Sequence, residues 1–190
     1  DGRCQSLDIA MCEKHDRADD LQLTIAPETL LSVAYTSGST AEPKGVIWSH
    51  RNLLHTIMLA TNEFHCCDRD RIVYLTAGTA AAVNHPFLAL LVGAAVLPFD
   101  VKEHGLDALI SWLREEEISI CQLSAQLFRS LARMQTGRID LPSLRLLRLS
   151  SEASYKSDFE LYRKVFPRHC LLANSVTPAE THLLTTYLLD

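Results

Sequence analysis

Apolar and polar positions alternate in blocks along the chain from Leu30 onward. Short runs rich in Leu, Ile and Val are typical of buried strands, whereas apolar residues that recur every three or four positions indicate amphipathic helices. We therefore expect strands at 30–35, 45–48, 71–76, 94–99, 118–123, 144–150, 169–174 and 182–189. We expect helices at 49–64, 81–91, 105–117, 125–135 and 156–166.

This alternation of strands and helices predicts the fold class. Short connections between strand and helix favour parallel strands joined by helical crossovers, because a tight turn cannot join parallel neighbours. We expect an α/β fold, in which a doubly wound, largely parallel sheet is flanked by helices. Ligands of such sheets bind outside the carboxyl ends of the strands, and the loops after Tyr35 and after Ala173 are expected there.

Composition narrows the range of functions. The 190 residues are 47% hydrophobic, enough for a core of ordinary size, and residues 30–190 are expected to form one domain core preceded by a connecting segment at 1–29. A net charge of −5 argues against a nucleic-acid or membrane-surface binder. The polar N-terminus resembles neither a signal peptide nor an anchor, so we expect a cytoplasmic protein.

The six cysteines are expected to be reduced. Cys66 and Cys67 are adjacent, and Cys121 and Cys170 lie in apolar runs, where a thiol behaves as a small hydrophobic group. A metal site at Cys4, Cys12 and His15 lacks a second close pair at zinc-finger spacing.

The stretch 36–45, TSGSTAEPKG, combines hydroxyl side chains, two glycines and one lysine. Such a loop suits an anion, and a phosphate is the best candidate. It is not a Walker loop, because Pro43 precedes Lys44 and Gly45 follows it. The third glycine of a dinucleotide-binding fingerprint is also missing.

The order of residues in this loop, followed by WSHRNLL, resembles the phosphate loop of the adenylate-forming superfamily, which includes acyl-CoA synthetases and the adenylation domains of nonribosomal peptide synthetases. Only Ala41 departs from the usual loop, where it replaces a glycine. The resemblance implies an ATP site with Mg²⁺. The residues that would bind the triphosphate or let the loop close over it are Thr36, Ser37, Gly38, Ser39, Thr40, Lys44 and Gly45.

A second match follows the strand at 169–174, where NSVTPAET resembles the family's Asn-x-Tyr-Gly-Pro-Thr-Glu motif. By this resemblance Asn174 and Thr181 belong to the nucleotide site and Glu180 holds Mg²⁺. Thr36, Lys44 and Glu180 would then be the catalytic residues. Val176 stands where the family has the Tyr that stacks on adenine, Thr177 replaces a Gly and Ala179 replaces a Thr.

The resemblance also suggests which acid is activated. Amino-acid-activating relatives carry an Asp at the position of Ala80, and a buried ammonium without such a counter-charge would cost several kcal/mol. We therefore expect a carboxylic acid without an α-amino group. The expected lining of the acyl pocket is Ala80, Gln122, Arg148, Ser150, Ser175 and Leu183. Arg148 has the alternative of a surface arginine on an alternating strand.

The implied reaction forms an acyl-adenylate and passes the acyl group to the thiol of CoA or of a carrier-protein phosphopantetheine. His50 and His85 are not expected to act as bases, because an ionised carboxylate needs none. The family's later motifs do not follow before Asp190, so we expect the chain to need the remainder of the adenylation domain and to be inactive alone.

Two alternatives stay open. One is a non-catalytic structural or partner-binding module derived from the same fold, favoured by Val176 and Ala179. The other is an unrelated α/β nucleotide binder.

Overall fold

The computed structural model describes residues 22–36, 44–75, 84–150, 152–176 and 184–189. The strands are β1 (Leu30–Thr36), β2 (Lys44–Ser49), β3 (Arg71–Leu75), β4 (Ala95–Phe99), β5 (Ile120–Ser124), β6 (Leu146–Ser150), β7 (Leu171–Val176) and β8 (Thr185–Leu189). The helices are α1 (His50–Phe64), α2 (Asn84–Val92), α3 (Val101–His104), α4 (Asp107–Glu115), α5 (Ala125–Arg133) and α6 (Lys156–Val165). Within this part of the chain, no helix combines the length and apolar character that crossing a membrane requires.

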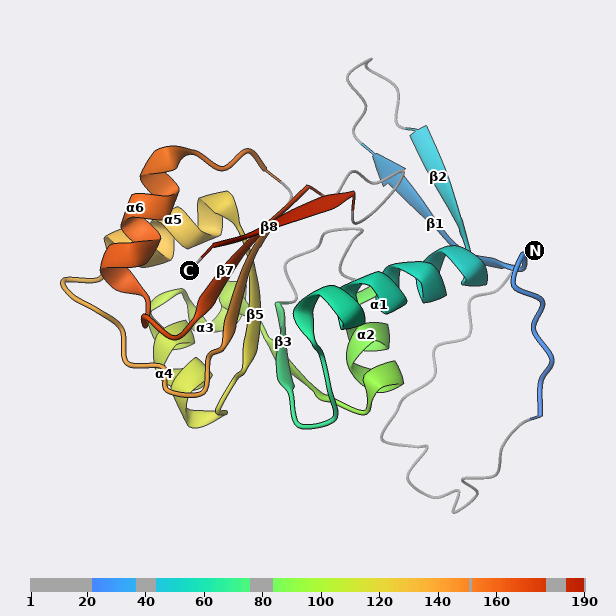
Figure 1. The fold of residues 1–190 in the computed structure, drawn as a ribbon, viewed down its shortest axis with the longest axis horizontal. Helices are drawn as coiled ribbons and strands as arrows, with labels where there is room; N and C mark the ends of the chain where they lie inside the picture. The colour runs from blue at the N-terminus through green and yellow to red at the C-terminus, as the bar shows by residue number, and fades with distance from the viewer. Residues whose placement is uncertain (1–21, 37–43, 76–83, 151, 177–183, 190) are drawn as a thin grey trace.

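The main sheet has the strand order β4-β3-β5-β6-β7-β8 (Figure 1). Neighbouring strands from β4 to β7 run parallel, and β8 pairs antiparallel with β7 at the edge. This arrangement confirms the prediction of a largely parallel α/β sheet. The predicted strands and helices also agree with the observed ones to within a few residues in most cases.

Helices cover both faces of the sheet. On one face, α4, α5 and α6 contribute buried residues such as Leu109, Phe128 and Tyr162 to the larger core. On the other face, α1 and α2 contribute Leu53 and Ala89 to a second core. The predicted double winding is therefore confirmed, because the two cores pack against opposite faces of the same sheet.

Helix α1 begins and ends where its local sequence indicates. The Ser49 side chain accepts a hydrogen bond from the Asn52 N–H, and the Asn52 side chain accepts one from the Ser49 N–H. This capping box satisfies two N–H groups that would otherwise lack partners at the helix start. The buried residues Leu53, Ile57, Ala60 and Phe64 form one stripe along the helix.

Two predictions about local structure are wrong. β1 and β2 form a separate antiparallel hairpin, so the loop after Tyr35 does not leave a strand of the main sheet. Gly105 ends α3 with a φ of 79°, a left-handed conformation that favours glycine, and the expected helix at 105–117 therefore begins only at Asp107. The short helix α3 was not predicted.

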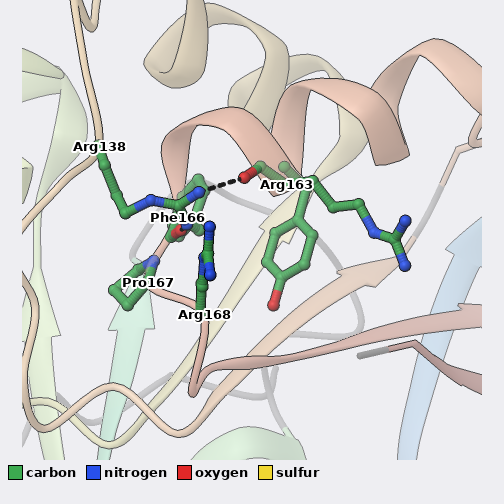
Figure 2. Close-up of a pocket in the computed structure, with 6 residues that line it drawn as sticks. Arg138, Arg163, Phe166, Pro167 and Arg168 are labelled. Carbon is green, nitrogen blue, oxygen red and sulfur yellow. Dashed lines mark hydrogen bonds between the residues drawn. The ribbon is translucent and has the colours of Figure 1, made fainter.

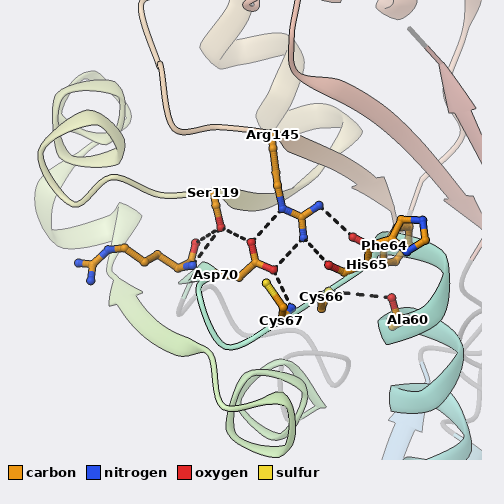
Figure 3. Close-up of polar contacts among 9 residues, drawn as sticks. Ala60, Phe64, His65, Cys66, Cys67, Asp70, Ser119 and Arg145 are labelled. Carbon is orange, nitrogen blue, oxygen red and sulfur yellow. Dashed lines mark hydrogen bonds and ion pairs between the residues drawn. The ribbon is translucent and has the colours of Figure 1, made fainter.

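An ion pair between the buried Asp70 and the half-buried Arg145 joins the amino-terminal ends of three strands (Figure 3). Both carboxylate oxygens of Asp70 accept hydrogen bonds from Arg145, at 2.9 and 2.7 Å, and Ser119 donates a further one at 2.7 Å. Arg145 also donates to the carbonyl oxygens of Phe64 and His65 at the end of α1. The group therefore fixes the end of α1 against the starts of β3, β5 and β6.

The charges in this group hold Asp70 ionised. Burial alone would raise the pKa of the Asp70 carboxyl, but hydrogen bonds from Arg145, the Cys67 N–H and Ser119 outweigh it and keep that pKa below its ordinary value. The neighbouring Cys66 thiol has no comparable donor, and burial raises its pKa to about 11. The described cysteines Cys66, Cys67, Cys121 and Cys170 are free thiols.

Candidate functional site

The predicted phosphate loop joins the two strands of the β1–β2 hairpin. Thr36 and Lys44 are partners at the end of this ladder, so the two predicted catalytic residues start and finish the loop opposite one another. Lys44 is exposed to solvent. Ser37, Gly38, Ser39 and Thr40 lie outside the described residues, and their phosphate contacts stay predictions.

Gly45 differs from the expectation for this loop. It pairs with Tyr35 inside the ladder rather than lying in a free loop. A Cβ at Gly45 would meet Val33 at 3.4 Å and the Tyr35 ring at 3.6 Å, which is close to ordinary contact. The part of the loop that could open or close therefore does not include Gly45.

The second predicted motif begins in β7. Asn174 accepts a hydrogen bond from the Ser154 hydroxyl at 2.9 Å, which holds its side chain. Val176, at the position of the family's adenine-stacking Tyr, is 45% exposed. Glu180, Thr181 and Leu183 lie outside the described residues, as does Ala80, so the metal and nucleotide roles in this segment stay predictions.

Four of the predicted pocket residues come together on one face of the sheet. Gln122 pairs with Arg148 across β5 and β6, and Arg148 pairs with Ala173 of β7. Side chains two apart on a strand share a face, which places Ser150 beside Arg148 and Ser175 beyond Ala173. This face is the one that α1 covers, since Ile120, Leu146 and Ala173 belong to the core that α1 helps to form.

Hydrogen bonds connect these side chains into one polar row. Arg148 donates from Nε to the Ser175 hydroxyl and from Nη1 to Gln122 Oε1, each at 3.0 Å. Gln122 in turn donates to the Ser150 hydroxyl at 2.6 Å. Ser150 and Ser175 are both buried, at 1% and 4% exposure. We call Gln122, Arg148, Ser150 and Ser175 the polar row.

The Arg148 guanidinium lies over the ring of Phe64, with its central carbon 5.0 Å from the ring centroid. Burial lowers the pKa of this guanidinium to about 10, so it is still charged at neutral pH. Arg148 is half-buried on the face that α1 covers, which differs from the alternative of a fully exposed surface arginine. Alternation along β6 leaves Arg148 on the α1 side while Leu147 and Leu149 enter the other core.

A cavity of about 470 Å³ lies between α1 and β8, lined by Leu59, Asn62, Glu63, Leu184, Thr185 and Thr186. Its wall connects to the polar row, because the hydroxyl oxygens of Thr186 and Ser175 are 3.0 Å apart. Arg148 is thus two hydrogen bonds from a space large enough for a small organic acid. The cavity and the polar row form the candidate acyl site.

A second cavity, of about 390 Å³, lies at the carboxyl end of α6 (Figure 2). Arg138 donates to the backbone carbonyl oxygens of Arg163, at 2.7 Å, and Phe166. Those are carbonyl groups that a helix end leaves without intrahelical partners, so Arg138 has a structural role there. Pro167 and Arg168, which line this cavity, come just before β7 in the chain. The cavity therefore lies near the amino-terminal end of that strand.

Sequence reasoning missed Phe64, Thr186 and the cavity wall on α1. Phe64 has the spacing of a core residue, and nothing local indicates that a guanidinium stacks on it. Thr186 reaches Ser175 only because β8 pairs antiparallel with β7. No three potential metal ligands gather among the residues that the structure describes, a set that does not include Glu180.

Comparison with known proteins identifies relatives of this chain. Surfactin synthase subunit 2 of Bacillus subtilis is 34% identical over 189 residues, which cover 97% of this chain and 5% of that protein. Tyrocidine synthase 3 of Brevibacillus parabrevis is 34% identical over 85% of this chain and 2% of its own length. The chain therefore spans only a small part of the curated relatives that it matches.

Solved structures show the same fold. The N-terminal subdomain of Klebsiella oxytoca NpsA, in complex with 3-hydroxybenzoyl-AMSN, has a TM-score of 0.78 at 19% identity and covers 95% of this chain and 46% of that one. The Vibrio cholerae adenylation domain AlmE, in complex with glycyl-adenosine-5'-phosphate, has a TM-score of 0.77 at 20% identity, over 90% and 32%. The AMP-binding enzyme family matches residues 5–190, and this chain belongs to it as part of an adenylation domain.

Proposed function

We propose that this chain belongs to a larger protein that activates a carboxylic acid with ATP and passes the acyl group to a thiol. The acceptor is CoA or the phosphopantetheine of a carrier protein, and the remainder of the adenylation domain completes the site. The observation that carries the proposal is the hydrogen-bonded row of Gln122, Arg148 and Ser175, which reaches the cavity between α1 and β8 through Thr186.

The described ends of the phosphate loop fit a polyphosphate. Thr36 and Lys44 stand opposite each other on the hairpin, and the lysine is exposed, so its ammonium is available to a negatively charged ligand. Glu180 would hold Mg²⁺, and Ser37, Gly38, Ser39, Thr40, Asn174 and Thr181 would complete the nucleotide site. Metal, ammonium and hydroxyl groups together offset the repulsion between two anions.

In the proposed reaction, a carboxylate oxygen of the acid forms a bond to the α-phosphorus of ATP. The bond from that phosphorus to the bridging oxygen breaks, and pyrophosphate leaves with the electron pair of that bond. The acid enters already ionised, so no side chain has to remove a proton. Lys44 acts by stabilising negative charge as it develops on the phosphates.

We further propose that the acid lacks an α-amino group. Ala80, at the position where amino-acid-activating relatives carry an Asp, offers no counter-charge for an ammonium. The Ser175 hydroxyl, 3.0 Å from that of Thr186 in the cavity wall, supplies a neutral hydrogen-bonding group instead.

Exchange of radiolabelled pyrophosphate into ATP, measured with the complete polypeptide, tests the activity. We expect exchange that depends on an added acid and falls at least about a hundredfold in Lys44→Met. Lys156→Met, on the exposed face of α6, is the matched control and should exchange normally. Strong exchange with common α-amino acids and none with amine-free acids would overturn the substrate assignment.

A non-catalytic module remains the second candidate, and Val176 is the observation that favours it. An apolar side chain offers adenine no aromatic face. Titration of Mg²⁺ and ATP into the complete polypeptide and its Glu180→Gln variant by calorimetry separates the two. Binding that weakens in the variant supports catalysis, whereas no binding to either protein supports the non-catalytic module.

A further inference from the structure

Arg148 makes no ion pair with a carboxylate in the described part of the chain. Its two hydrogen-bond acceptors, Gln122 Oε1 and the Ser175 hydroxyl, are both neutral. The ion pairs among the described residues join other arginines to their acids, as Arg145 to Asp70 and Arg129 to Asp158. Arg148 is half-buried, and a cation taken partly out of water with neutral partners is costly.

The bonding of the guanidinium leaves one side open. Nε and Nη1 are occupied, while Nη2 has no acceptor among the described residues. The guanidinium lies over the Phe64 ring of α1, with its central carbon 5.0 Å from the ring centroid. Gln122 is itself held by Ser150, so the row fixes the guanidinium in place before any ligand arrives. Fixed donors of this kind suit a carboxylate, which an arginine can bind with two parallel hydrogen bonds.

Glu63 is the acidic residue whose charge acts on the Arg148 guanidinium. It favours the charged form of Arg148 through space, without an ion pair, and it lines the cavity from the α1 side. The cavity therefore has a carboxylate on its helix wall, and a guanidinium lies two hydrogen bonds from Thr186 on its strand wall. A negatively charged ligand group is repelled by the first and attracted by the second, so it is directed toward β6.

We propose that Arg148 binds a second carboxylate, at the far end of the acyl substrate, and that the protein activates a dicarboxylic acid. This inference rests on the proposed function, because it assigns the substrate class of that same site. Arg148 is then the residue that determines specificity, and Gln122, Ser150 and Ser175 position it. The other carboxylate of the acid is the one that attacks ATP.

Pyrophosphate exchange with matched pairs of acids tests the assignment in the complete protein. The probes are succinate and glutarate, compared with butyrate and valerate of the same chain length. We expect kcat/KM for the diacid to exceed that for the monoacid about tenfold or more. Equal or higher kcat/KM for the monoacids would overturn the inference while leaving the proposed function standing. Absence of exchange with every acid would overturn both.

Variants of Arg148 provide a second test of the assignment in the same exchange assay. Arg148→Met should lower kcat/KM for the diacid about tenfold to a hundredfold and leave that for the monoacid unchanged or higher. Arg148→Lys keeps the charge without the planar fork, and should retain a reduced preference for the diacid even if the Met variant does not fold. Arg168→Met, at the second cavity, is the control and should keep the wild-type ratio. An unchanged ratio in either Arg148 variant would overturn the role of this side chain.

Discussion

Arg145 Nη2 lies 2.7 Å from Asp70 Oδ2, although 75 residues separate the two in the chain. The pair connects the start of β3 to the start of β6, and the same guanidinium holds the end of α1. The ring of Phe64 in α1 covers Arg148, so this pair also sets the position of the helix over the polar row.

We predict that Asp70→Asn destabilises the chain by about 2–4 kcal/mol, because Arg145 keeps its charge and loses its partner. The value lies below that of a fully enclosed pair, since the Arg145 side chain is 37% exposed. Urea denaturation followed by circular dichroism measures it. Glu160→Gln removes an exposed pair on α6 and should cost less than about 0.5 kcal/mol. Equal losses in the two variants would contradict the structural role of Asp70.

Stability should also fall in acid. The pKa values of Asp70 and Asp158 are both held below the ordinary value, that of Asp158 chiefly by its hydrogen bond from Arg129. A carboxyl whose pKa is lower in the folded state stabilises the fold fully above its unfolded pKa, which is about 3.9 for Asp. That contribution is lost as the pH falls through the folded pKa.

Urea denaturation between pH 7 and pH 3 tests the effect of these two carboxyls. The free energy of unfolding should stay nearly constant down to about pH 5 and then decrease. Asp70→Asn should show a smaller decrease than the wild type, because it has one such carboxyl fewer. An identical decrease in both proteins would show that Asp70 does not contribute.

The capping box of α1 supports a third prediction. Ser49→Ala should lower the free energy of unfolding by about 1 kcal/mol, because the Asn52 N–H then loses its acceptor. Ser111→Ala in α4 is the control, since that hydroxyl bonds only to an exposed carbonyl group within its own helix, and it should change stability by less than about 0.5 kcal/mol. Thermal unfolding of the three proteins side by side measures both effects.

The fourth prediction concerns the nucleotide. Val176→Tyr should tighten ATP binding about tenfold, because it adds an aromatic face for adenine at a position that is 45% exposed. Val176→Leu adds apolar area without an aromatic ring and serves as the control. Calorimetric titration with Mg²⁺ and ATP measures both affinities. Equal affinities for the two variants would place adenine away from Val176.

The sequence predicted some features of this structure and not others. The helix at 49–64 was predicted correctly because its cap and its apolar stripe are both local features. The separate β1–β2 hairpin was missed because the apolar pattern of a strand does not record which sheet it joins. The environment of Arg148 was left open because alternation along β6 gives two faces, and only the packed helix decides which face is covered.

The sequence by itself determined the alternating α/β elements and the two motifs that resemble adenylate-forming enzymes, because these depend on residue order and on spacing within a segment. The tertiary structure alone decided that Gln122, Arg148 and Ser175 of the polar row bond to one another, that Ser175 reaches Thr186, and that Arg148 lies over Phe64. Those residues come from four strands and a helix. Their contacts depend on strand order, on register and on the antiparallel return of β8, which no local pattern specifies.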